Sequence, residues 1–209
     1  MPTRPDIRKG EGFVRTYELF EELQSDVIRA YEVLEEQRDS QFLRRATVRA
    51  IFSLIEASTE IIKSEIRSTI RLEGGQNDLP KKELDVLGGL SITSEPRGQK
   101  FLSLEENLKL TFKLAAQTWR LPEFQLDAGG ENYREFLQAK DARNRLTHPR
   151  TYYDIQVTDE DMHCHTVAFK WSCQEFNRLF QHRAKHLSTQ IPAEDKKAFS
   201  KKIGGIGGA

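Results

Sequence analysis

The stretch 42-FLRRATVRAIFSLIEASTEII-62 decides the fold class of this chain. Its apolar residues return every three or four positions, which places them on one face of an α-helix. The stripe runs slightly beyond the stretch and consists of Leu43, Ile51, Leu54, Ile55, Ile61, Ile62 and Ile66. It stops before the glycine pair of 73-EGGQND-78, and glycine commonly follows the end of a helix. We therefore expect a long amphipathic helix with one face in a core.

Other segments show the same period. An earlier stripe predicts a helix and consists of Phe13, Tyr17, Phe20, Leu23, Val27, Tyr31 and Leu34. After the central stretch we expect a short helix at Lys81–Leu87, followed by a loop that glycine and proline mark. A further helix is expected after Ser103, because Ser103 and Glu106 have the spacing of a capping box.

Two more helices are expected towards the C-terminus. Residues 131–148 are predicted to be helical up to Pro149, because the residue before a proline avoids the α region. Residues 151–157, TYYDIQV, are β-branched and aromatic, so we expect an extended segment there. The last long helix covers residues 158–187, with Thr158 as its N-cap and acidic residues in its first turn.

The predicted fold class is all-α. We expect an antiparallel bundle of four long helices and one or two short ones, in one domain over residues 13–187. Residues 1–12 and 188–209 combine proline, glycine and charge without a helical period. They are therefore expected to form a flexible N-terminal arm and a flexible C-terminal tail.

Composition narrows the possible functions of the 209 residues. There are 32 basic and 32 acidic residues, and this balance argues against a general nucleic-acid coat but allows a local basic site. No stretch approaches the roughly 20 apolar residues that cross a bilayer, and the first residues lack the apolar core of a secretory signal. Cys164 and Cys173 lie too far apart on one expected helix for a disulfide. We therefore expect a reducing compartment, the cytoplasm.

The segment 140-KDARNRLTHPR-150 concentrates charge at a helix end. At about 100° per residue, the apolar face of Tyr133, Phe136 and Leu137 continues into polar residues. These residues, which lie on or beside that face, are Lys140, Arg143, Asn144, Thr147 and His148. Three others are expected to point towards water: Glu135, Gln138 and Arg145.

Two explanations fit this segment. Cations near a helix C-terminus complement its free carbonyl groups, and this accounts for Arg145 and Arg150 as surface charges. Together with Lys140, these two could hold a nucleic-acid backbone. The second explanation is a phosphate site at Arg143 and His148. Arginine binds phosphate oxygens with a planar fork of donors, and an imidazole can exchange a proton with a reacting hydroxyl.

The pattern Arg143-Asn144-x-x-x-His148 resembles the signature of HEPN domains (higher eukaryotes and prokaryotes nucleotide-binding). That signature is an arginine, a polar residue that is often asparagine, and a histidine four to six residues after the arginine. The order of the helices is similar too. Residues 42–62 resemble the second helix of the family, and residues 101–117 and 133–150 resemble later ones. The resemblance covers roughly residues 13–187.

The resemblance implies a metal-independent endoribonuclease, a toxin or a defence effector, that cleaves RNA by attack of its own 2′-hydroxyl. It implies a homodimer in which the motifs of two chains face one composite cleft, and a partner such as an antitoxin or another regulatory protein. Arg143 would stabilise the charged transition state, His148 would act as general acid or base, and Asn144 would position it. No cofactor is expected.

Alternatives stay open. Other HEPN domains have lost cleavage and bind only a nucleotide or a protein, and a plain helical scaffold is a third reading. The tyrosine that a nucleotidylated subgroup carries two residues after the histidine is replaced here by Arg150. The family often adds a polar residue from an earlier helix, for which Glu56 and Ser58 are both candidates.

The last predicted helix does not favour a metal site. His163 and His182 lie about 28 Å apart along a straight helix, and His182 with His186 provides only two ligands. This helix carries one apolar face with Met162, Phe169, Cys173, Phe176, Phe180 and Leu187. Nearly opposite lie Cys164, Val167, Ala168, Trp171 and Leu179. Such a helix is either central in one bundle or packs with one face on a second chain, and the resemblance favours the second chain.

Overall fold

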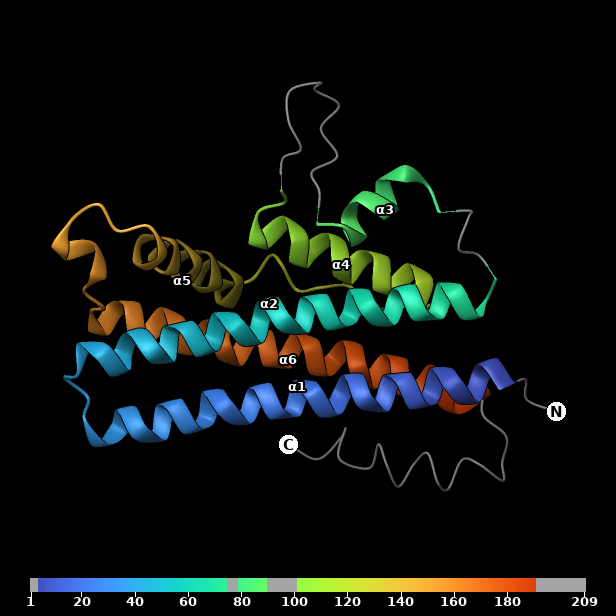
Figure 1. Ribbon diagram of the computed structural model, residues 1–209, viewed down its shortest axis with the longest axis horizontal. Helices are drawn as coiled ribbons and strands as arrows, with labels where there is room; N and C mark the ends of the chain where they lie inside the picture. The colour runs from blue at the N-terminus through green and yellow to red at the C-terminus, as the bar shows by residue number, and fades with distance from the viewer. Residues whose placement is uncertain (1–3, 75–78, 90–100, 191–209) are drawn as a thin grey trace. The chain divides into compact units, whose positions relative to one another are not determined.

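The computed structural model describes residues 4–74, 79–89 and 101–190, and its helices confirm the all-α class (Figure 1). The elements in chain order are α1 (Arg4–Glu36), α2 (Gln41–Leu72), α3 (Lys81–Leu87), α4 (Leu104–Thr118), α5 (Glu131–Thr147), the 3-10 helix η1 (Tyr152–Ile155) and α6 (Asp159–Gln190). Three of these helices have 32 or 33 residues. Helices α4 and α5, with 15 and 17 residues, are about half as long.

The chain divides into two compact units, and their borders fall inside α1, α2 and α6. Unit 1 comprises the chain up to Glu18, residues Thr59–Leu126 and the chain from Asn177. Unit 2 comprises residues Leu19–Ser58 and Asp127–Phe176. The apolar pattern does not reveal this division, because each of the three long helices continues through the border without a break.

Aromatic contacts form the core of unit 1. Phe13 and Tyr17 of α1 pack edge-on against Phe180 of α6, with ring centroids 6.1 and 5.6 Å apart. Phe124, in the loop after α4, packs on His182 of α6 at 5.6 Å. Residues that are distant in the sequence thus share one apolar core, which is the main source of stability for helices of this kind.

A buried ion cluster lies in the same unit. The guanidinium of Arg183 lies 5.0 Å from the centre of the Trp119 ring, and one of its nitrogens is 3.6 Å from the Glu65 carboxylate. Lys9, which is also buried, pairs at 2.8 Å with Glu73, which keeps 37% of its side chain exposed. Burial raises the pKa of Glu65 to about 7, although the charge of Arg183 acts in the opposite direction. Removing one partner of such a buried pair is costly, because the other charge stays buried.

Helix α1 begins at Arg4, whereas the sequence pattern predicts an arm over residues 1–12. Residues 1–3 lie outside the described residues. Glycine weakens the helical pattern in this region, but packing explains why a glycine stands at position 12 of the helix. A Cβ atom there would lie 3.0 Å from Oε2 of Glu65, so the missing side chain lets the buried carboxylate approach the helix.

At the other end, α6 continues to Gln190, three residues into the predicted tail. The remaining part of that tail, residues 191–209, lies outside the described residues.

Unit 2 is built from four α-helical segments and η1. The α-helical segments are the second part of α1, the first part of α2, α5 and the first part of α6. Phe20 and Tyr31 of α1 pack on Phe176 and Phe169 of α6, with centroid distances of 5.7 and 6.0 Å. The Tyr31 hydroxyl also shares a 2.9 Å hydrogen bond with the hydroxyl of Thr166. One side of α6 is therefore covered by α1.

Helix α5 covers another side of α6. Trp171 packs on Tyr133 and Phe136 at 5.2 and 4.9 Å, and its indole N–H donates a 3.0 Å hydrogen bond to the carbonyl of Asp127. Both apolar faces of α6 are thus used within the chain, and α6 is a central helix. This finding overturns the argument that one of its faces is left for a second chain.

Local signals place several helix ends as expected. Ser103 and Glu106 form the predicted capping box at the start of α4. The Thr158 hydroxyl accepts a 3.1 Å hydrogen bond from the backbone N–H of Asp161, whose carboxylate accepts one from Thr158 N at 3.0 Å. Helix α3 has the predicted bounds, Lys81–Leu87.

The segment after α5 differs from its prediction. Its composition predicts an extended segment, but Tyr152–Ile155 form the 3-10 helix η1. Thr151 and Asp154 make a capping box around this short helix. Such side-chain hydrogen bonds to the backbone compete with extended structure, and here they outweigh the β propensity of the segment.

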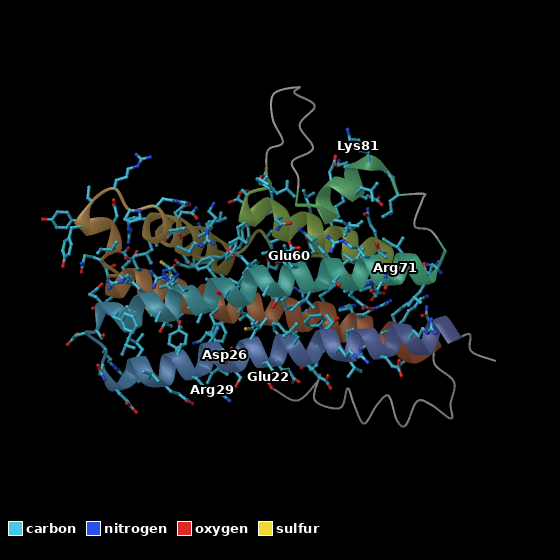
Figure 2. The ribbon with its side chains drawn as sticks, in the orientation of Figure 1. Glu22, Asp26, Arg29, Glu60, Arg71 and Lys81 are labelled. Atoms are coloured by element: carbon cyan, nitrogen blue, oxygen red, sulfur yellow. The ribbon has the colours of Figure 1, made fainter. Side chains whose placement is uncertain are left out.

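Helix α1 exposes charged side chains such as Glu22, Asp26 and Arg29 (Figure 2), and it also exposes the apolar side chains of Leu19, Ile28 and Val33. None of the described helices carries an apolar stretch that is long enough to span a bilayer.

Candidate functional site

Helix α5 carries most of the candidate residues, and its buried face differs from the projected one. The buried residues are Tyr133, Phe136, Ala139 and Ala142, spaced by three. The projection continues the face into Lys140, Asn144 and Thr147, but Asn144 and Thr147 are exposed. The projection was drawn from the bulky residues at the start of α5. In the structure, the small alanines lie on the side that packs against neighbouring helices. Because three residues turn through less than a full helical turn, this face rotates along α5.

Arg143 is fixed by groups from two helices. Its Nη2 donates to Oε1 of Glu56 on α2, and its Nη1 donates to Oδ1 of Asn144 at 3.2 Å. The guanidinium lies 5.8 Å from the centre of the Phe52 ring, within the range of a cation–π contact. The side chain keeps 28% of its surface exposed, so Arg143 is held in place and is still open to a ligand.

The structure distinguishes the two candidates for the earlier polar residue. Glu56 forms an ion pair with Arg143. Ser58 is fully buried, and its hydroxyl has no hydrogen-bond partner among the described residues. Glu56 is therefore the residue that belongs to the site.

His148 ends α5 and is exposed. Its backbone N–H donates to the carbonyl of Asn144 at 3.0 Å, and the Thr147 hydroxyl donates to the carbonyl of Arg143 at 2.9 Å. These bonds satisfy carbonyls that a helix end leaves open. In the part of the chain that the structure describes, the His148 ring has no hydrogen-bond or ion-pair partner. Asn144 thus contacts the Arg143 side chain and supports the His148 backbone.

The three predicted backbone-binding cations have different surroundings. Arg150 is exposed. Lys140 keeps only 17% of its side chain exposed and lies 3.5 Å from Asp141. Arg145 pairs with Asp161 of α6 at 2.8 Å and donates to the carbonyls of residues 154 and 156, both at 3.3 Å. Arg145 therefore links α5 to α6 and to the backbone around η1, while 37% of its side chain stays exposed to water. The contact of Arg145 with Asp161 joins residues 16 positions apart in the sequence, so a local pattern does not reveal it.

Several contacts anchor η1 beside the candidate site. The Asp154 carboxylate accepts hydrogen bonds from the backbone N–H groups of Arg150 and Thr151 at 2.8 and 2.7 Å, and these bonds lower the pKa of Asp154. Arg45 of α2 donates to the carbonyl of Ile155 at 3.1 Å. Arg145 holds the same turn from α5. The backbone after His148 is therefore well fixed.

His165 is a buried histidine below the site. It packs edge-on against Phe52 at 5.8 Å, on the ring that also contacts Arg143. Both ring nitrogens lack a hydrogen-bond partner among the described residues. Burial lowers the pKa of His165 to about 4; nearby Asp161 acts against this shift and Arg145 acts with it. Histidine and cysteine are common metal ligands, so the run 163-HCH-165 suggests a metal site, but His165 is part of the core.

The described histidines, cysteines and acids form no group of three that could hold a metal ion. Cys164 and Cys173 are free and buried, and burial is the main cause that raises the pKa of each thiol to about 12. Neither is a candidate for nucleophilic chemistry, because the reactive form of cysteine is the thiolate.

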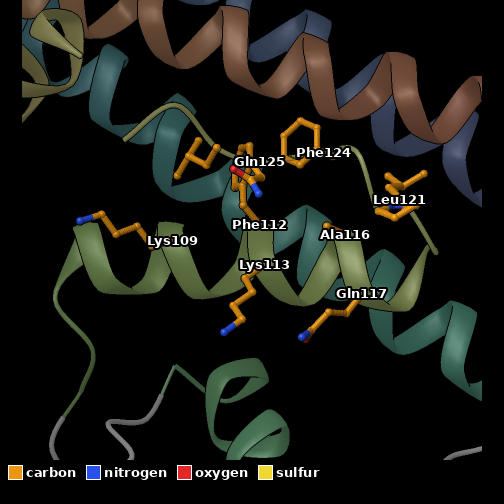
Figure 3. Close-up of a pocket in the computed structure, with 10 residues that line it drawn as sticks. Lys109, Phe112, Lys113, Ala116, Gln117, Leu121, Phe124 and Gln125 are labelled. Atoms are coloured by element: carbon orange, nitrogen blue, oxygen red, sulfur yellow. The ribbon is translucent and has the colours of Figure 1, made fainter. Parts of the chain in front are cut away.

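A separate pocket of about 400 Å³ lies in unit 1, between α4 and the loop that follows it (Figure 3). Phe112 and Phe124 line it, and Lys109 and Lys113 project from α4 beside it. None of the residues that the motif singles out lines this pocket.

No protein-family model matches the chain, and no curated protein or solved structure matches it either.

Proposed function

We propose that this protein cleaves RNA without a metal ion, with Arg143 and His148 as the catalytic residues. One observation carries the proposal: Glu56 of α2 holds Arg143 of α5, while His148, the C-cap of the same helix, is exposed and its ring has no partner among the described residues. The HEPN resemblance supplies the reaction. Because the resemblance also calls for a polar residue from an earlier helix, the contact with Glu56 supports it.

The reaction would be an attack of the RNA on itself. The 2′-hydroxyl gives its proton to a base, its oxygen bonds to phosphorus, and the bond from phosphorus to the 5′-oxygen breaks. The leaving 5′-oxygen takes up a proton, which leaves a 2′,3′-cyclic phosphate and a 5′-hydroxyl end. His148 serves one of the proton transfers, and Arg143 stabilises the negative charge on the phosphate oxygens.

Glu56 and Asn144 are positioning residues in this proposal. A guanidinium that is fixed before the substrate arrives loses little freedom in the reaction, and this increases its effect on the transition state. A second copy of the chain would supply the other proton transfer, as the resemblance implies for a dimer. Mixing wild-type protein with His148→Ala protein tests this point: a cleft that needs both histidines is inactive in mixed dimers, so activity should fall more steeply than the fraction of wild-type chain.

The direct test uses an end-labelled RNA, the purified full chain and an excess of chelator. We expect cleavage with chelator, a cyclic phosphate on one product, and no cut at a site with a 2′-deoxy nucleotide. Arg143→Ala and His148→Ala should each lower the rate at least roughly 100-fold, the effect of losing one charge-stabilising or acid–base group.

Matched controls come from the same unit. Arg29→Ala and His163→Ala remove an exposed arginine on α1 and an exposed histidine on α6, and they should cleave like wild type. If all four variants cleave equally, the activity belongs to a contaminant and the proposal fails. If no RNA is cut but a nucleotide or a protein binds in an Arg143-dependent way, the non-catalytic alternative replaces it.

A further inference from the structure

Two neighbouring tyrosines stand out on the surface of unit 2. Tyr152 and Tyr153 keep 70% and 80% of their surface exposed, more than any other large apolar side chain described in this unit. An aromatic ring of this size contributes to stability mainly by leaving water. Two such rings side by side on η1 add little to the fold, so they are available for a ligand.

The backbone that carries the rings is fixed, as the contacts of η1 show. Asp154 caps the turn from within, and Arg45 and Arg145 hold its carbonyl groups from α2 and α5. Gln41 adds two hydrogen bonds to the backbone of Val157, at 2.9 and 3.1 Å. Rings on such a base lose little backbone freedom when a ligand binds, which favours affinity.

The orientation of the rings selects the ligand. Their centroids are 6.2 Å apart and their planes are inclined by 74°. Two bases on these two rings cannot belong to one continuous stack, because each base lies parallel to its own ring. The pair therefore fits splayed, unpaired bases and does not fit a duplex, whose bases are stacked on one another.

The position of the pair agrees with a substrate of the candidate site. Tyr152 is four residues after His148, so at up to about 3.6 Å per residue their Cα atoms are at most about 14 Å apart. The exposed cation of Arg150 lies between them in the sequence and can contact a phosphate.

We propose that Tyr152 and Tyr153 form a base-stacking platform that binds single-stranded RNA beside the phosphate on which Arg143 and His148 act. The assignment of this ligand rests on the proposed function. A platform that separates neighbouring bases also helps the chemistry, since the attacking 2′-oxygen must line up with the leaving 5′-oxygen. Regular helical stacking prevents that alignment, whereas a splayed strand allows it.

The test measures binding apart from cleavage. The full chain with His148→Ala is titrated against a fluorescent single-stranded RNA and against the same RNA in a duplex. We expect tighter binding to the single strand. Adding Tyr152→Ala and Tyr153→Ala together should weaken that binding roughly 10- to 100-fold, the effect of losing stacked bases, while Tyr→Phe at both positions should preserve it.

Phe101→Ala is the matched control, because Phe101 is an equally exposed aromatic side chain in unit 1. It should bind RNA like the parent protein, and circular dichroism should show that all variants are folded. Unchanged binding after loss of both tyrosine rings overturns the platform. So does equal binding of duplex and single strand, or a Tyr→Phe variant that is as weak as the alanine variant.

Wild-type cleavage separates this inference from the proposed function. The two tyrosine-to-alanine changes are also made together in the wild-type background. If wild type cleaves RNA and this variant binds and cleaves it equally well, the platform fails and the proposed function stands. If ring-dependent binding occurs but wild type cuts nothing, the stacking surface stands and the proposed catalysis fails. If the rings bind a protein and no RNA, the platform is overturned.

Discussion

Replacing His165 with leucine tests the pH dependence that its burial predicts. The side chain is fully buried, and its ring nitrogens have no partner among the described residues. At neutral pH the leucine variant should be as stable as wild type or more stable, because an unpaired polar group leaves the core and an apolar one of similar size replaces it.

The size of the pH effect on stability follows from the shift in the pKa of His165. Burial lowers the pKa of His165 from 6.5 to about 4, so between these values the unfolded chain binds more protons than the folded one. The free energy of unfolding therefore falls as the pH falls through this range. The loss from this residue is about 2 kcal/mol by pH 5 and about 3 kcal/mol by pH 4. Above pH 6.5 its contribution is fully present.

The assay is urea unfolding of both proteins, followed by circular dichroism at several pH values from 7.5 to 4.5. The free energy of unfolding of the variant should exceed that of wild type by a growing amount as the pH falls. Glu65, whose pKa burial raises to about 7, has the opposite sign, because its folded form binds more protons between pH 4.5 and 7. Glu65 is present in both proteins and cancels in the difference. Parallel pH profiles for the two proteins would refute the reasoning.

Two further substitutions test structural contacts by the same unfolding assay. Arg145→Ala should lower the free energy of unfolding by about 2 kcal/mol, because it removes an ion pair and two hydrogen bonds to carbonyl groups. Arg150→Ala is the control and should change it by less than about 0.5 kcal/mol. Equal effects of the two substitutions would contradict the structural role of Arg145. Gly12→Ala should be destabilising by about 1 kcal/mol or more although alanine favours helices, because its Cβ would meet the buried Glu65 carboxylate at 3.0 Å. Gly129→Ala, which meets nothing within 4 Å, is the control and should be close to neutral, and a stabilised Gly12 variant would show that Glu65 moves freely.

Features that depend on neighbouring residues were accessible from the sequence. The bounds of α3 and the caps at Ser103 and Thr158 follow from local hydrogen bonding and backbone preferences, and they were predicted correctly. Features that depend on residues distant in the sequence could not be predicted from it. The tie from Arg145 to Asp161 and the approach of Glu65 to α1 involve contacts that no local pattern encodes.

The candidate site shows the same limit. The motif singled out Arg143 and His148, but only the structure distinguishes Glu56 from Ser58, since both occupy α2 at similar spacing. The exposure of Tyr152 depends on the capping box of η1, which outweighs the strand propensity of its segment.

The burial of Cys164 and Cys173 has a practical consequence for solution work. Because both thiols are buried and have pKa values near 12, they should react with alkylating reagents mainly when unit 2 opens. Their labelling rate in the native protein therefore reports how often this region opens. A cysteine introduced at the surface would label first, so a dye can be attached at one chosen position without removing either native cysteine.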